Sequence, residues 1–98
     1  PTRRSSDLLA LAPARPTPFS DRTDVSWTMP RAGVATLCVY DVLGRRVRTL
    51  AEGARPAGAH TTAWDGRDGH GARVPAGAYL IVLESEGVRR ARRVVRLP

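Results

Sequence analysis

The residues with the greatest chemical potential lie just after Trp64. Asp65, Asp68 and His70 are closely spaced and carry oxygen and nitrogen donors of the kinds that bind metal ions. A calcium loop needs oxygen ligands at alternate positions, but Arg67 occupies the next such position after Asp65, and no bidentate glutamate follows. We therefore expect no metal and no cofactor here. Both aspartates are instead expected to accept hydrogen bonds from backbone N–H groups and to hold a turn.

The side chains that could serve nucleophilic catalysis or zinc binding are few and scattered. Zinc would have only His60, His70 and Cys38 as nitrogen and sulfur ligands. As the single cysteine, Cys38 excludes an internal disulfide, and its place inside a strand-like run favours a buried or half-buried thiol. No serine lies in the glycine pattern of a nucleophile elbow. The serines considered are Ser20, Ser26 and Ser85.

A phosphate-binding loop is also not supported. Gly66, Gly69 and Gly71 are closely spaced, but they do not lead from a strand into a helix whose N-terminus would meet the phosphate. We therefore expect no small-molecule substrate, no catalytic residue and no enzymatic activity.

Charge is the next feature that could indicate a partner. The chain has a formal net charge of +7, and all 16 of its basic residues are arginine. Basic proteins often bind nucleic acid, but these arginines are spread over many segments and aromatic residues make up only 5%. We expect no nucleic-acid partner. The densest arginines lie near the end of the chain and are our candidate interaction residues: Arg89, Arg90, Arg92, Arg93 and Arg96. The alternative is that they protect an edge strand from aggregation.

The elements that must position these residues are strands. Apolar and polar residues alternate in short runs separated by glycine and proline, and no run has a helical period. We expect strands at residues 21–29, 34–40, 45–50, 60–64, 78–83 and 88–97, an additional edge strand at 9–12, and a loop at 51–58. This pattern predicts an all-β fold, an antiparallel immunoglobulin-like β-sandwich of about seven short strands, with a small barrel as the rival architecture.

The alternation also predicts the core. In the last run it groups Ala91, Arg93, Val95 and Leu97 on one face, which we take to be the inner one. The expected core residues are Trp27, Leu37, Val39, Trp64, Tyr79, Ile81, Leu83 and Val95.

Length and composition indicate one domain. A chain of 98 residues buries roughly 65% of its unfolded surface, enough for one core. No run approaches the ~18 apolar residues of a membrane helix, so we expect no membrane insertion. Residues 1–8 resemble a translated sequencing adapter, and residues 1–12 are expected to be artefact or linker with a possible first edge strand. Residues 13–98 are expected to form one immunoglobulin-like domain, the C-terminal part of a larger protein.

Several motifs carry a resemblance to known families over about residues 13–97. They are PTPF at 16–19, VYDVLGR at 39–45, PAGAH at 56–60, WDGRD at 64–68, VPAGAY at 74–79 and RRVVRL at 92–97. They are similar to motifs of the immunoglobulin-like domains related to the flagellar hook-capping protein, and equally to those of the C-terminal type A sorting domains of the bacterial type IX secretion system. The chain departs from the pattern at Cys38, where lysine is common, and at Arg96, where an apolar residue is usual.

This resemblance implies export rather than catalysis. Our main interpretation is a sorting or anchoring domain that directs a secreted bacterial cargo protein through the type IX secretion system. Its partners would be the secretion machinery or neighbouring domains of the parent protein, and its location secreted or at the cell surface, reached through the periplasm. The alternative is a structural immunoglobulin-like module of a flagellar hook-capping or cell-surface scaffold protein.

Overall fold

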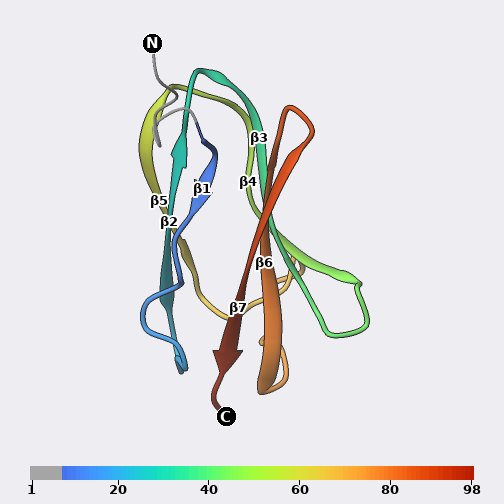
Figure 1. Ribbon diagram of the computed structural model, residues 1–98. Coiled ribbons are helices and arrows are strands. Elements are labelled where there is room, and N and C mark those ends of the chain that lie inside the picture. Colours follow the sequence, from blue (N-terminus) through green and yellow to red (C-terminus); the bar gives the residue numbers. More distant parts are fainter. Residues whose placement is uncertain (1–7) are drawn as a thin grey trace.

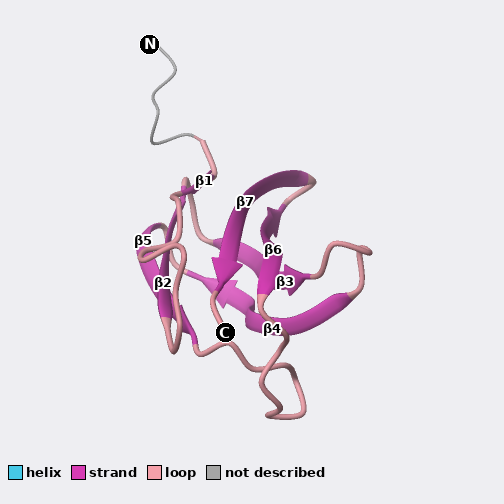
Figure 2. Cartoon of the chain, turned by 90° about the horizontal axis from the view of Figure 1, so that it is seen from below, coloured by secondary structure: helices cyan, strands magenta, loops and turns pink. Residues whose placement is uncertain are grey.

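The computed structural model describes residues 8–98 as two antiparallel β-sheets packed face to face (Figure 1). Figure 2 shows the two sheets as separate layers. The strands are β1 (Ala10–Leu11), β2 (Thr23–Met29), β3 (Gly33–Tyr40), β4 (Arg46–Arg55), β5 (Gly58–Trp64), β6 (Gly77–Ser85) and β7 (Val88–Arg96). The predicted all-β sandwich is confirmed, and the barrel alternative is wrong because the strands form two separate sheets.

The sheets divide the strands unequally. One has the order β1-β2-β5 and the other β4-β3-β6-β7. The described residues include no helix that is long and apolar enough to cross a membrane. The packing begins at Leu9 and Leu11, which are each 4% exposed and lie before the boundary expected at residue 13. The proposed artefact at residues 1–8 falls almost entirely on residues 1–7, which lie outside the described part of the chain.

The core between the sheets is centred on an aromatic cluster. Trp64, at the end of β5, is fully buried, and its ring centroid lies 5.3 Å from that of Phe19 and 5.4 Å from that of Tyr79. The Tyr79 hydroxyl donates to the Pro75 carbonyl, four residues upstream, as in the tyrosine corners of other β-sandwiches. The cluster therefore joins the two sheets and the segment that precedes β2.

Seven of the eight predicted core residues are buried, but Val95 is not among them; its neighbour Val94 is fully buried instead. The cause is the β6–β7 turn. Glu86 and Gly87 both have positive φ, at 51° and 79°, which is the geometry of a two-residue type I′ hairpin. This turn pairs Ser85 with Val88, and the resulting register pairs Tyr79 with Val94. The predicted inner face of the last strand is therefore wrong.

Strand β4 also differs from the prediction, because it continues through residues expected to form a loop. Its pairing with β3 is interrupted by two register shifts, each typical of a β-bulge. Val47, Leu50 and Ala51 all pack against the core, although strict alternation would place Leu50 opposite the other two. The predicted loop at residues 51–58 is wrong for residues 51–55, because the bulges reset the alternation and let the strand continue, and it is wrong for Gly58, where β5 begins.

Truncation of Trp64 tests this core. Trp64→Ala removes a fully buried ring that contacts both other aromatic side chains, and we expect the free energy of unfolding to fall by about 3–5 kcal/mol. Urea unfolding followed by circular dichroism measures it. Val34→Ala, at a side chain that is 63% exposed, is the control and should cost less than about 1 kcal/mol. Equal midpoints for the two variants would contradict the assignment.

Candidate functional site

The connection between β5 and β6 is held by its own aspartates. Asp65 Oδ1 accepts a hydrogen bond from Arg67 N at 3.1 Å. Asp68 Oδ1 accepts hydrogen bonds from His70 N at 2.8 Å and from Ala72 N at 3.0 Å. The prediction that these two carboxylates hold the turn through backbone N–H groups is confirmed.

The same connection is fastened to the edge of β4. Gly69 N donates to Val47 O at 3.1 Å. The Nη1 atom of Arg48 donates both to Asp65 Oδ1, at 2.9 Å, and to the Arg67 carbonyl, at 3.1 Å. That carbonyl also accepts a hydrogen bond from Trp64 Nε1 at 3.0 Å. The connection is therefore a fixed part of the sandwich and covers one end of an edge strand.

These contacts lower the pKa of each carboxyl group. The backbone N–H groups of His70 and Ala72 hold the pKa of Asp68 below its ordinary value. Desolvation acts to raise the pKa of Asp65, but the hydrogen bonds from Arg67 N and the Arg48 guanidinium outweigh it, and the pKa is lowered. In the β3–β4 turn, hydrogen bonds led by that from Arg45 N lower the pKa of Asp41.

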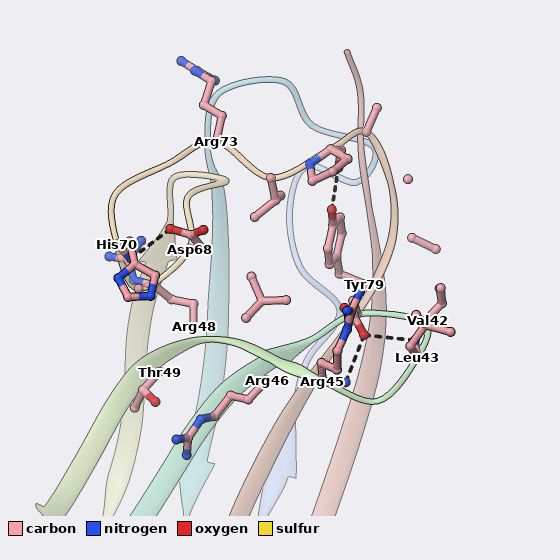
Figure 3. Close-up of a pocket in the computed structure, with 18 residues that line it drawn as sticks. Val42, Leu43, Arg45, Arg46, Arg48, Thr49, Asp68, His70, Arg73 and Tyr79 are labelled. Atoms are coloured by element: carbon pink, nitrogen blue, oxygen red, sulfur yellow. Dashed lines mark hydrogen bonds and ion pairs between the residues drawn. The ribbon is translucent and has the colours of Figure 1, made fainter.

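A cleft of about 770 Å³ lies between the β3–β4 turn and this connection (Figure 3). Its lining includes several arginines, but most are already paired. Arg45 forms an ion pair with Asp41 and Arg48 with Asp65, both at 2.9 Å. Arg73 forms a longer ion pair with Asp21, at 3.8 Å. The labelled Arg46 and Arg73 point away from one another at opposite ends of the view in Figure 3. The cleft therefore does not gather its cations around one point where an anion could bind.

The other residues considered for catalysis or metal binding are also committed to structure. The His60 ring stacks on Trp27 with centroids 4.6 Å apart, and its Nε2 lies 2.8 Å from the Pro56 carbonyl oxygen. Cys38 is buried, as predicted, with Sγ 3.7 Å from Thr49 Oγ1. Among residues 8–98, no three side chains of His, Cys, Asp or Glu gather in a group that could hold a metal ion.

Three of the five candidate interaction arginines donate hydrogen bonds to backbone carbonyls of the sandwich. The Nε atoms of Arg90 and Arg92 donate to the carbonyls of Leu9, at 3.0 Å, and Leu11, at 2.7 Å. These bonds join β7, at the edge of one sheet, to the β1 region of the other. They close this side of the sandwich, so the two guanidinium groups hold the edge.

Arg96 lies deeper still. It is only 7% exposed, and its Nη1 donates to the Val74 carbonyl at 2.8 Å. A Cβ atom at Gly66 would lie 2.8 Å from Arg96 Nε, and Gly66 also has φ of 73°, so this position needs glycine on both counts. The guanidinium of Arg96 is therefore inside the domain rather than on an interaction surface.

The remaining two arginines, Arg89 and Arg93, lie on the outer face of the four-stranded sheet. They line a shallow groove of about 390 Å³ together with Leu80 and Val42. Leu80 and Val42 are exposed apolar residues that the sequence analysis did not single out. The signal was present, because alternation along β6 places Leu80 on the face opposite Ile81.

The fold and these contacts define an immunoglobulin-like β-sandwich module. The chain belongs to the FlgD Ig-like domain family, whose family model matches residues 17–87.

The curated relatives support this membership. The basal-body rod modification protein FlgD of Salmonella typhimurium is 44% identical to the chain over 52 residues, which are 53% of this chain and 22% of that protein. The FlgD protein of Salmonella typhi matches equally. The chain thus spans about a fifth of the length of the curated relatives that it matches.

Solved structures show the same fold. FlgD from P. aeruginosa superposes with a TM-score of 0.61 at 26% identity, covering 76% of this chain and 60% of that one. PorZ, a surface component of the type IX secretion system of Porphyromonas gingivalis, superposes with a TM-score of 0.58 over 94% of this chain and 12% of its own. At 18% identity, the likeness to PorZ shows the fold alone.

These comparisons correct our main interpretation of the sequence. The family model, the Salmonella relatives and the P. aeruginosa structure are all FlgD. The interpretation as a sorting domain of the type IX secretion system is therefore wrong, and the hook-capping alternative fits better.

The lowered pKa of Asp68 leads to a pH prediction. A folded-state pKa below the unfolded value near 3.9 gives stability that is present above the unfolded pKa and lost as pH falls through the folded pKa. Asp68→Asn keeps an acceptor oxygen but removes the titrating charge. We expect its free energy of unfolding to vary less with pH than that of the parent below about pH 5.

Urea unfolding at a series of pH values from neutral to strongly acidic measures this dependence. The matched control is Asp21→Asn, at a side chain that is 86% exposed. This substitution should change the pH dependence of the free energy of unfolding less than Asp68→Asn does. If the free energy of unfolding varied with pH in the same way for Asp68→Asn and the parent, the Asp68 carboxylate would not contribute to the pH dependence of stability.

Proposed function

We propose that the chain is a structural immunoglobulin-like module of a flagellar protein of the hook-capping or rod modification type. The observation that carries the proposal is the FlgD family match over residues 17–87. The 44% identity to the basal-body rod modification protein of Salmonella typhimurium supports it. The module would serve the assembly of the flagellar rod or hook, working outside the cytoplasm.

The contacts of the polar side chains support a role without catalysis. The oxygens of Asp65 and Asp68 accept backbone hydrogen bonds, and His60 is stacked on Trp27. Side chains engaged in this way hold loops and edges and are not poised to act on a substrate. The partners of such a module would be neighbouring protein subunits or other domains of its parent protein.

A chimeric protein tests this role. In FlgD of Salmonella typhimurium, the whole immunoglobulin-like domain that contains the matching 52 residues would be replaced by residues 9–98. We expect the chimera to restore swimming and assembled hooks in a strain that lacks its own FlgD, because the shared fold would present equivalent surfaces. Swimming assays and electron microscopy of isolated basal bodies measure the outcome.

Two controls make the result decisive. A chimera carrying Trp64→Ala has a destabilised domain and should restore swimming poorly. An unrelated immunoglobulin-like sandwich of similar size in the same place should not restore it. The proposal fails if the parent chimera is produced at the normal level and the cells form no hooks.

A further inference from the structure

The outer face of the four-stranded sheet carries an apolar groove beside the β3–β4 turn. Tyr40 and Leu80 are direct neighbours across β3 and β6, and Ala78 precedes Leu80 on the same face. Leu80 is 38% exposed, and Val42 in the turn is 78% exposed. Leu43, beside Val42, is 73% exposed, so apolar side chains gather at one place on the surface.

The groove is also positively charged. Arg93 is the register partner of Leu80 on β7, and Arg89 lines the groove as well. Glu84 is the register partner of Arg89, yet no carboxylate of residues 8–98 lies within 4.0 Å of the guanidinium nitrogens of Arg89 or Arg93. Within the described part of the chain, both arginines are therefore without an ion-pair partner.

The acidic residue at the groove does not neutralise it. The carboxylate of Asp41 forms an ion pair with Arg45 at 2.9 Å. Its Oδ1 atom also accepts hydrogen bonds from the backbone N–H groups of Leu43 and Arg45, both at 2.9 Å. The match to the family model ends at Gly87, so Arg89 and Arg93 both lie outside the matched segment.

We propose that this groove binds a segment of a partner protein in which an apolar side chain lies next to carboxylates. The apolar side chain would contact Leu80, Tyr40 and Val42, and the carboxylates would pair with Arg89 and Arg93. Because the groove lies on the face of the sheet rather than at its edge, the segment would bind through side chains and would not add a strand. The inference rests on the proposed function for the origin of the partner, a neighbouring subunit of the flagellar assembly.

The groove suits a protein segment better than a nucleic acid. Binding of single-stranded nucleic acid uses several aromatic faces on which successive bases stack. Of the two tyrosines that line this groove, Tyr79 is only 7% exposed and its ring packs against Trp64 in the core. That leaves Tyr40 as a single ring for stacking, whereas Leu80 and Val42 suit an apolar side chain.

A random peptide library tests the proposal, because it samples many sequences and does not require the natural partner. Seven-residue peptides displayed on phage would be selected on the immobilised, purified chain. We expect the enriched peptides to combine aspartate or glutamate with leucine, isoleucine or phenylalanine. Titration of the isotope-labelled chain with the best synthetic peptide should shift the amide resonances of Tyr40, Leu80 and Arg93.

Matched variants assign the binding to the groove. Arg89→Ala with Arg93→Ala should weaken binding of that peptide by about fivefold, the effect of losing two exposed ion pairs. The control, Arg22→Ala with Arg55→Ala, removes the same charge from one exposed and one half-buried site outside the groove, and this variant should bind as the parent does. Leu80→Ala should also weaken binding, whereas Val34→Ala, outside the groove, should not.

Several outcomes would overturn the inference. These are selection of no peptide or of peptides without acidic residues, shifted resonances on another face, or equal losses in the two arginine pairs. Tighter binding of a single-stranded oligonucleotide at the same residues would also overturn it. Its failure is separable from that of the proposed function. If no peptide binds but the chimera restores swimming, only the proposal of a binding groove is overturned. If the peptide binds but the chimera forms no hooks, only the proposed flagellar role is overturned.

Discussion

The contact of Trp64 with Phe19 and Tyr79 is the interaction on which the rest of this sandwich depends. The three rings come from the end of β5, the segment before β2 and the start of β6, so the contact joins parts of both sheets. The Phe19 backbone extends this junction, since it donates to Val95 O at 3.0 Å and accepts from Leu97 N at 2.7 Å. The cluster thus fixes the distance between the two sheets, and the Phe19 backbone holds the end of β7 at the edge of the larger sheet. In a domain of this size, with a single core, few other contacts could replace it.

The chain passes from one sheet to the other directly after Trp64, whose ring is held in the aromatic cluster. The β5–β6 connection that follows therefore has little conformational freedom. Asp65 and Asp68 hold its turns, Arg48 fastens it to β4, and Gly66 leaves space for the buried Arg96. Asp65, Gly66 and Asp68 belong to the WDGRD motif, one of those by which the sequence resembles two families. Motifs that serve the fold in this way are expected wherever the fold is used, whatever the domain does. This explains why the sequence indicated the sandwich correctly but did not separate a flagellar module from a secretion signal.

Features that depend on residues close together in the sequence could be predicted, whereas features that depend on distant residues could not. Strand β2 shows regular alternation, β6 contains a continuous apolar run, and the turn aspartates act within a few residues of themselves, so all three could be predicted. Each bulge in β4 shifts the register with β3 by one residue, and the type I′ turn after β6 sets the register of β7, which decides the face on which each side chain lies. That register exchanged Val94 for Val95 in the predicted core. The contacts of Arg90 and Arg92 with the β1 region join residues 81 apart in sequence, and no local pattern reports such a pairing.

The arginines of β7 show how one residue type serves both the fold and the surface. On the inner face, Arg90, Arg92 and Arg96 direct N–H groups at backbone carbonyls, a use for which the rigid guanidinium, with several donors and weak hydration, is better suited than the strongly hydrated ammonium of lysine. On the outer face, the side chains of Arg89 and Arg93 make no such contact with described residues and lie beside exposed apolar groups. The register of one two-residue turn decides which arginines belong to which set. A shift by one residue would turn Arg93 to the inner face and Arg92 to the outer face, so the same hairpin that completes the core also determines the charge that the outer face presents to a partner.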